Sequence, residues 1–203
     1  MHRGSGRLGS LGIQKPAVDS CFDVAFWLLD RALDDGEYLQ PQKMHRLLFL
    51  AQAYYAAARH GAKLMPACFV AGPEGPLEPT VFKAMERARP MIDTVALEEE
   101  QEHVLDSVWR QFGSKSIERL NSAIMNHPPV HAASEAGEGT EISFESMVEF
   151  YVRALTTGQV GEKSKSAALA ADAPSADQVM RPKVMRSHTG KPVNVKGWSP
   201  RRV

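Results

Sequence analysis

Apolar residues recur at helical spacing through the middle of this chain, and proline or glycine interrupts each run. The first run follows Asp19, a good helix N-cap, and ends near Gly36. Its inward face is expected to contain Phe22, Ala25, Phe26, Leu29 and Leu33. The pattern therefore predicts an amphipathic helix that needs partners to cover its apolar side.

A second helix is predicted to begin at Pro41, because proline is favoured at the first helical position. His60 and Gly61 supply the stop at its C-terminal end. The apolar stripe of this helix consists of Met44, Leu47, Leu48, Ala51 and Tyr55. Both helices must bury one face, which favours a bundle.

Four further helices are predicted, over residues 79–88, 97–113, 114–126 and 143–155. Residues 67–79 differ, because a short extended piece runs there into the stiff sequence GPEGPLEP. The fold class is therefore all-α: a bundle of about six helices with a short β-like segment and a Gly/Pro loop.

The net charge of zero conceals a strongly uneven distribution. Residues 1–18 have a net charge of +3, residues 19–158 of −9, and residues 159–203 of +6. Residues 1–18 are rich in Gly, Ser and Arg, and residues 159–203 are rich in Ala, Ser, Pro and Lys. We expect a disordered N-terminal arm (1–18), an acidic helical domain (19–158) and a disordered basic tail (159–203).

Several classes of protein are disfavoured by composition. No apolar run approaches the roughly 18 residues that a membrane helix requires, and the N-terminus lacks the apolar stretch of a secretory signal. Cys21 and Cys68 are too few for a disulfide framework. These features predict a cytoplasmic protein that does not bind membranes.

Catalytic, metal and cofactor motifs are also not found. His127 and His131 have a spacing seen in zinc sites, but prolines intervene and no Cys-x-x-Cys pair accompanies them. The chain lacks a Gly-x-Ser-x-Gly elbow, a His-Glu-x-x-His helix and a Gly-x-Gly-x-x-Gly loop. We therefore expect no enzyme activity, no metal and no cofactor.

The candidate functional residues are those suited to contact another protein. Glu98, Glu99 and Glu100 form the densest acidic run; the alternative is a solvated helix start favoured by the helix dipole. Trp27 and Tyr54 are candidates for exposed aromatic contacts, although most aromatic residues in such stripes belong to the core.

Three further candidates are Gly75 and Pro76 in the proline-rich loop and Lys43 in the second predicted helix. Gly75 and Pro76 form either a partner-contact loop or, as we favour, a rigid structural turn. Lys43 lies near the start of an otherwise apolar helix, where a solvated or snorkelling lysine is the alternative to a binding residue.

Three segments occur in an order typical of one family. They are PQKMHRLLFLAQAY (41–54), FVAGPEGPLEPTVF (69–82), and FGSKSIERL (112–120) followed by HPP at residues 127–129. Together they resemble the Panacea domain, best known from SocA-type antitoxins and phage-associated GepA-like proteins. The resemblance covers roughly residues 20–155.

The resemblance implies an antitoxin of a toxin–antitoxin system. SocA-like proteins bind their toxin and act as proteolytic adaptors, delivering it to the ClpXP protease. Their toxin, SocB, blocks replication at the DNA sliding clamp. The expected partners are therefore a cognate toxin and ClpX. An acidic folded domain and a separate basic tail fit an adaptor that must contact two partners.

Two alternatives remain. A purely steric antitoxin would neutralise its toxin without delivering it to a protease. An autorepressor would bind nucleic acid through the basic tail, where Trp198 lies among lysines and arginines. The acidic domain disfavours nucleic acid, because its negative charge repels phosphates.

Overall fold

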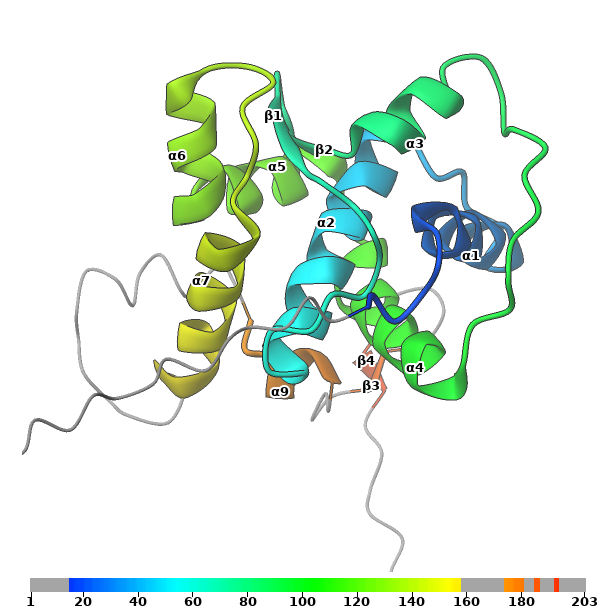
Figure 1. Cartoon of the computed structure of the whole chain (residues 1–203). Coiled ribbons are helices and arrows are strands. Elements are labelled where there is room, and N and C mark those ends of the chain that lie inside the picture. Colours follow the sequence, from blue (N-terminus) through cyan, green and yellow to red (C-terminus); the bar gives the residue numbers. More distant parts are fainter. Residues whose placement is uncertain (1–14, 158–173, 181–184, 187–191, 194–203) are drawn as a thin grey trace, which may run out of the picture.

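The computed structural model describes residues 15–157, 174–180, 185–186 and 192–193, and over these residues the chain is mostly helical (Figure 1). The helices are α1 (Cys21–Asp34), α2 (Pro41–Ala58), α3 (Pro79–Ala84), α4 (Glu99–Val108), α5 (Ile117–Met125), α6 (Pro128–Ala136), α7 (Phe144–Thr157) and α9 (Ala176–Met180). A single π-helical turn, η1 (Trp109–Gly113), continues α4. The strands form two antiparallel pairs, β1 (Val70–Gly72) with β2 (Gly75–Leu77), and β3 (Met185–Arg186) with β4 (Pro192–Val193).

Helix α2 lies at the centre of the bundle, with its residues buried from Met44 to Ala57. It contacts α1, α4, α5, α7 and α9, which surround it in Figure 1. The side chain of Gln52 is polar but paired: its Oε1 accepts the backbone N–H groups of Leu64 and Met65 at 3.1 and 3.0 Å. This contact attaches the loop that follows α2 to the core without leaving a buried polar group unsatisfied.

Helix α1 begins one residue later than predicted, with Ser20 rather than Asp19 as its N-cap. The Ser20 hydroxyl accepts the N–H of Phe22, and the carboxylate of Asp23 accepts the N–H of Ser20. These reciprocal bonds form a capping box. The inward position predicted for Leu33 is wrong, since this side chain is 74% exposed. The neighbouring Ala32 lies on the buried face of α1. Because a helix turns by about 100° from one residue to the next, Leu33 lies off that face.

The Gly/Pro loop forms the β1–β2 hairpin, in which Val70 pairs with Leu77 and Gly72 with Gly75. Arg46 of α2 donates from Nη1 to the carbonyl of Pro76 at 2.8 Å. Gly75 has a φ of +139°, and a Cβ atom at this position would lie 2.8 Å from Nε of Arg46. Only glycine fits here, both conformationally and sterically.

Two helices among the described residues were not predicted. We expected residues 126–129 to end a helix, but Pro128 is the first residue of α6 and His127 is its N-cap. Conversely, the helix predicted over residues 79–88 ends at Ala84.

The second unpredicted helix, α9, lies in the segment that we expected to be a disordered tail. Its residue Val179 is 1% exposed, and the element contacts α2, α4 and α7. Just before it, the hydroxyl of Tyr54 donates to the carbonyl of Pro174 at 2.7 Å. The prediction of disorder is therefore wrong for residues 174–180. Burial of Val179 and this hydrogen bond offset the entropy of ordering the segment. The rest of both arms lies outside the described residues, apart from 15–18 and the β3–β4 pair.

Candidate functional site

An open depression of about 870 Å³ lies between α1 and α4 and reaches the C-terminal end of α2. Its acidic lining residues are Asp30, Asp34, Glu99, Glu100, Glu102 and Asp106. The remaining lining residues are Trp27, Arg31, Arg59, His103 and Arg110. We call this surface the acidic depression. It has a formal net charge of −3 when His103 is neutral.

The acidic side of the depression is formed by the first turns of α4. Glu98 is the N-cap of this helix, and Oε1 of Gln101 accepts the Glu98 N–H at 2.9 Å in a capping box. Gln101 also donates from Nε2 to the carbonyl of Ala17 at 2.8 Å, which fixes the start of α4 against the segment before α1. Glu99 and Glu100 follow in the first turn, where the positive end of the helix dipole stabilises their charges.

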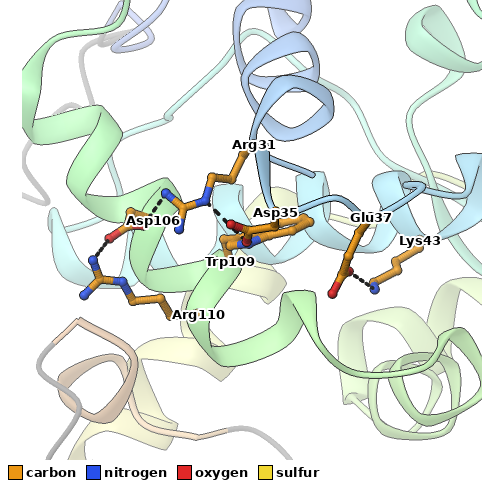
Figure 2. Close-up of polar contacts among 7 residues, drawn as sticks. All are labelled: Arg31, Asp35, Glu37, Lys43, Asp106, Trp109 and Arg110. Carbon is orange, nitrogen blue, oxygen red and sulfur yellow. Dashed lines mark hydrogen bonds and ion pairs between the residues drawn. The ribbon is translucent and has the colours of Figure 1, made fainter. Parts of the chain in front are cut away.

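A network of ion pairs joins the two walls of the depression, as Figure 2 shows. Arg31 of α1 lies between two carboxylates, with its Nη1 3.2 Å from Asp106 and its Nε 3.6 Å from Asp35. Asp106 is also 2.6 Å from Nη2 of Arg110, and Asp35 accepts the indole N–H of Trp109 at 2.7 Å. These partly buried groups hold α1 and α4 in a fixed relation.

The arginines of the depression are thus engaged by carboxylates. Arg59 completes the set, since its Nε lies 2.7 Å from Oε1 of Glu100. Asp30 pairs with Arg89, which lies outside the lining. Over the described residues, no lysine or arginine pairs with Asp34, Glu99 or Glu102. Among the described residues, the negative charge of these three carboxylates is therefore uncompensated. A half-buried tryptophan, Trp27, lies in the same lining.

Of the predicted site residues, Trp27, Glu99 and Glu100 come together in this depression, and Glu98 caps the helix that carries two of them. Trp27 is half-buried and packs against the core. The prediction for Tyr54 is wrong: its side chain is 1% exposed, and its ring stacks on Phe112 at a centroid distance of 5.6 Å. Tyr54 lies on the buried side of the central helix and offers no contact surface.

Lys43, Gly75 and Pro76 lie away from the depression. Gly75 and Pro76 are buried in the hairpin, which makes them a structural turn rather than a contact loop. The side chain of Lys43 is 13% exposed, with its Nζ 3.9 Å from Glu37 (Figure 2). Burial lowers the pKa of this lysine, and the nearby Glu37 carboxylate opposes that effect.

The sequence pattern did not identify the other residues of the depression. Asp30 and Asp34 have no feature in the sequence that separates them from a solvated helix end, and the contribution of Asp106 and Arg110 depends on how α4 packs. The sequence signal that could have identified Asp30 and Asp34 is their spacing from Trp27. Positions separated by three or four residues share one face of a helix.

A buried cluster of Cys21, His45 and Glu78 resembles a nucleophile with a base, but its electrostatics are unsuitable. Cys21 Sγ lies 4.0 Å from Oε2 of Glu78, and Nδ1 of His45 accepts the N–H of Glu78 at 3.4 Å. Burial raises the pKa of Cys21 to about 11 and lowers that of His45 to about 4. Both shifts oppose the thiolate and imidazolium forms that an activated cysteine requires.

Two further features are absent from the described residues. No group of three or more His, Cys, Asp or Glu side chains there is arranged to hold a metal ion. In that part of the chain, no helix is both long and apolar enough to cross a membrane.

No protein-family model matches the chain, and no curated protein or solved structure matches it either. The geometry of the depression and the motifs of the sequence are therefore the features that bear on function.

Proposed function

We propose that this chain is an antitoxin that binds a basic partner protein at the acidic depression and delivers it to a ClpXP-type protease in the cytoplasm. The observation that carries the proposal is the concave surface around Trp27, where Asp34, Glu99 and Glu102 have no cationic partner among the described residues. A surface of this kind favours a partner with complementary positive charge.

The negative charge of the depression would mainly raise the rate of association with a basic partner. Carboxylates on a concave surface focus the electrostatic field and raise the rate at which a basic partner arrives. Trp27 supplies apolar contact area in the same surface, and tryptophan is enriched among the residues that dominate binding energy. The carboxylates would therefore speed association, and Trp27 would stabilise the bound complex.

The family resemblance supports the choice of an antitoxin over other binding proteins. The Panacea-like segments resemble those of proteins that neutralise toxins by direct contact. Delivery to a protease requires a second surface, for which the tail is a candidate. A steric antitoxin, which neutralises the toxin without its degradation, is the nearest alternative.

Co-expression with the product of the adjacent reading frame tests the proposal. The decisive variant is Asp34→Asn/Glu99→Gln/Glu102→Gln, which removes three charges from the depression with little change in shape. Its control, Glu86→Gln/Asp93→Asn/Glu138→Gln, removes three charges from exposed residues elsewhere. We expect the control to protect cells from the toxin and the decisive variant to fail.

Equal protection by both variants would contradict the role of the depression. Toxin half-life separates the two antitoxin mechanisms: an adaptor shortens it in cells that contain the protease, whereas a steric antitoxin leaves it unchanged. A toxin that remains lethal beside the wild-type chain would refute both.

A further inference from the structure

Residues 86–97 form a long connection between α3 and α4 that runs past α1 (Figure 1). We call this segment the strap. It contains no helix or strand, and its residues are exposed except for Pro90 and Leu97, which are half-buried. Met91 is fully exposed and Val95 is 64% exposed, so the strap buries little apolar surface. Polar contacts must therefore contribute much of the stability of its position against α1.

Two polar contacts among the described residues attach the strap to α1. Near its start, the guanidinium of Arg89 forms a bidentate ion pair with Asp30, in which Nη1 donates to Oδ1 and Nη2 lies 3.1 Å from Oδ2. Further along, the N–H of Val95 donates to Oδ1 of Asp23 at 3.0 Å. The strap therefore runs along α1 in the direction opposite to the helix.

Arg89 also contacts an aromatic ring. Its guanidinium carbon lies 4.2 Å from the ring centroid of Phe26, a side chain that is only 5% exposed. Phe26 and Asp30 are four residues apart and share one face of α1, so a single arginine can meet both. A carboxylate beside an aromatic ring suits arginine better than lysine, because a guanidinium can bond both oxygens and stack on the ring.

Asp30 links this arrangement to the acidic depression. Its side chain lines the depression and is 57% exposed, whereas Arg89 lies outside the lining. Trp27, next to Phe26 in the chain, lies in the same lining. A cation that enters the depression can therefore reach Asp30 and compete with Arg89 for it. An exposed ion pair contributes little net free energy, so a partner that supplies additional contacts can displace it.

We propose that Asp30 and Phe26 form the binding site for an arginine of the basic partner, and that Arg89 occupies this site in the free chain. The partner's arginine takes the place of Arg89, which releases the strap and uncovers the Phe26 ring beside Trp27. This site rests on the proposed function, because the acidic depression is taken as the surface where the partner binds. A partner shifts the balance between the two states only as far as it binds the released state more tightly.

Hydrogen exchange of the Val95 N–H measures release of the strap in the full chain without any partner, because this amide is protected while it is bonded to Asp23. In Arg89→Gln the exchange rate should rise about fivefold, since the ion pair and the ring contact are both lost. Arg87→Gln removes the same charge from another exposed residue of the strap and should leave the rate unchanged. Equal exchange rates in the two variants would overturn the role of Arg89 in holding the strap.

A capped hexa-arginine peptide is the probe for the arginine site, with hexalysine as a comparison of equal charge. Saturating hexa-arginine should raise the exchange rate of the Val95 amide about threefold in the wild type and add nothing in Arg89→Gln, where the strap is already released. Calorimetry should find that hexa-arginine binds about threefold more tightly than hexalysine, and Asp30→Asn should remove this preference. Arg89→Gln should lower the Kd of hexa-arginine about threefold relative to Arg87→Gln, because the probe and Arg89 compete for one site.

Equal Kd values for hexa-arginine and hexalysine, or no binding of hexa-arginine, would overturn the arginine site. Binding that leaves the exchange of the Val95 amide unchanged would overturn the displacement of Arg89. These results are independent of the toxin assay. A chain that fails to protect cells but releases its strap on binding hexa-arginine would refute the proposed function and support the arginine site.

Discussion

Acidification from pH 7.5 to pH 5.5 should destabilise this fold through two buried histidines, His45 and His127. Burial lowers the pKa of each to about 4, and for His45 the neighbouring Arg46 contributes in the same direction. In the unfolded chain a histidine titrates near 6.5. Between these values the unfolded state binds more protons than the native state, so the free energy of unfolding falls as the pH falls.

The magnitude follows from the two pKa values. A group that titrates at about 4 in the native state and at about 6.5 in the unfolded state loses about 1.3 kcal/mol between pH 7.5 and pH 5.5. The two histidines together should therefore cost about 2.7 kcal/mol, a large part of the stability of an ordinary domain. Below about pH 4 the contribution stops growing, because both states are then protonated.

Urea unfolding followed by circular dichroism at the two pH values measures this effect. In His127→Phe the difference between pH 7.5 and pH 5.5 should fall by about 1.3 kcal/mol, whatever the absolute stability of the variant. His131→Asn, on the same helix but with an exposed side chain, is the control and should keep the wild-type difference. Glu78, whose pKa burial raises, acts with the opposite sign but equally in all three proteins.

A stability that is constant between pH 7.5 and pH 5.5 would refute the reasoning. If the free energy of unfolding of His127→Phe changes between pH 7.5 and pH 5.5 as much as that of the wild type, this histidine is not held neutral by the fold.

Other substitutions test individual contacts that stabilise the fold. Gly75→Ala should destabilise the protein by about 1–3 kcal/mol in urea unfolding, because φ is +139° and the new Cβ would meet Arg46; an unchanged midpoint would contradict this account. Ser20→Ala should cost about 1 kcal/mol through loss of the N-cap of α1, and no loss would show that the cap is dispensable. Tyr54→Phe should cost about 1 kcal/mol and speed proteolysis near Pro174, since their hydrogen bond is lost; wild-type cleavage would argue that other contacts hold this segment.

The helical class could be predicted from the sequence because the periodic signal is strong where packing is strongest. Pro41 opens α2, and the buried positions of that helix include the whole predicted stripe. The sequence was less informative at Pro128, because proline both ends one helix and begins the next. Here the preceding His127 serves as N-cap, so a new helix starts directly after α5.

Local pattern also could not predict which surface residues meet. Trp27 and the glutamates of α4 were singled out separately, but nothing in either segment shows that α1 and α4 face each other. Arg31 and Asp106 establish that relation only once the chain has folded. The prediction that Tyr54 is exposed was wrong for a related reason. Helix α2 is covered on all sides, so aromatic residues outside its predicted apolar stripe are buried too.

The ordered segment at residues 174–180 shows the limit of composition as a guide. Its alanines and serines resemble those of a disordered tail, and only Val179 and Met180 add apolar area of any size. Whether such a segment is ordered depends on a surface elsewhere in the chain against which it can pack. Here α2, α4 and α7 provide that surface.

The most direct test of the central claim is the affinity of the full chain for its purified toxin partner, measured by calorimetry at about 50 mM and about 300 mM salt. The account predicts that Asp34→Asn/Glu99→Gln/Glu102→Gln binds at least tenfold more weakly than Glu86→Gln/Asp93→Asn/Glu138→Gln at low salt. It also predicts that the difference narrows at high salt, because exposed charges are then screened. Equal affinities of the two variants at low salt would contradict the assignment of the acidic depression as the partner-binding surface.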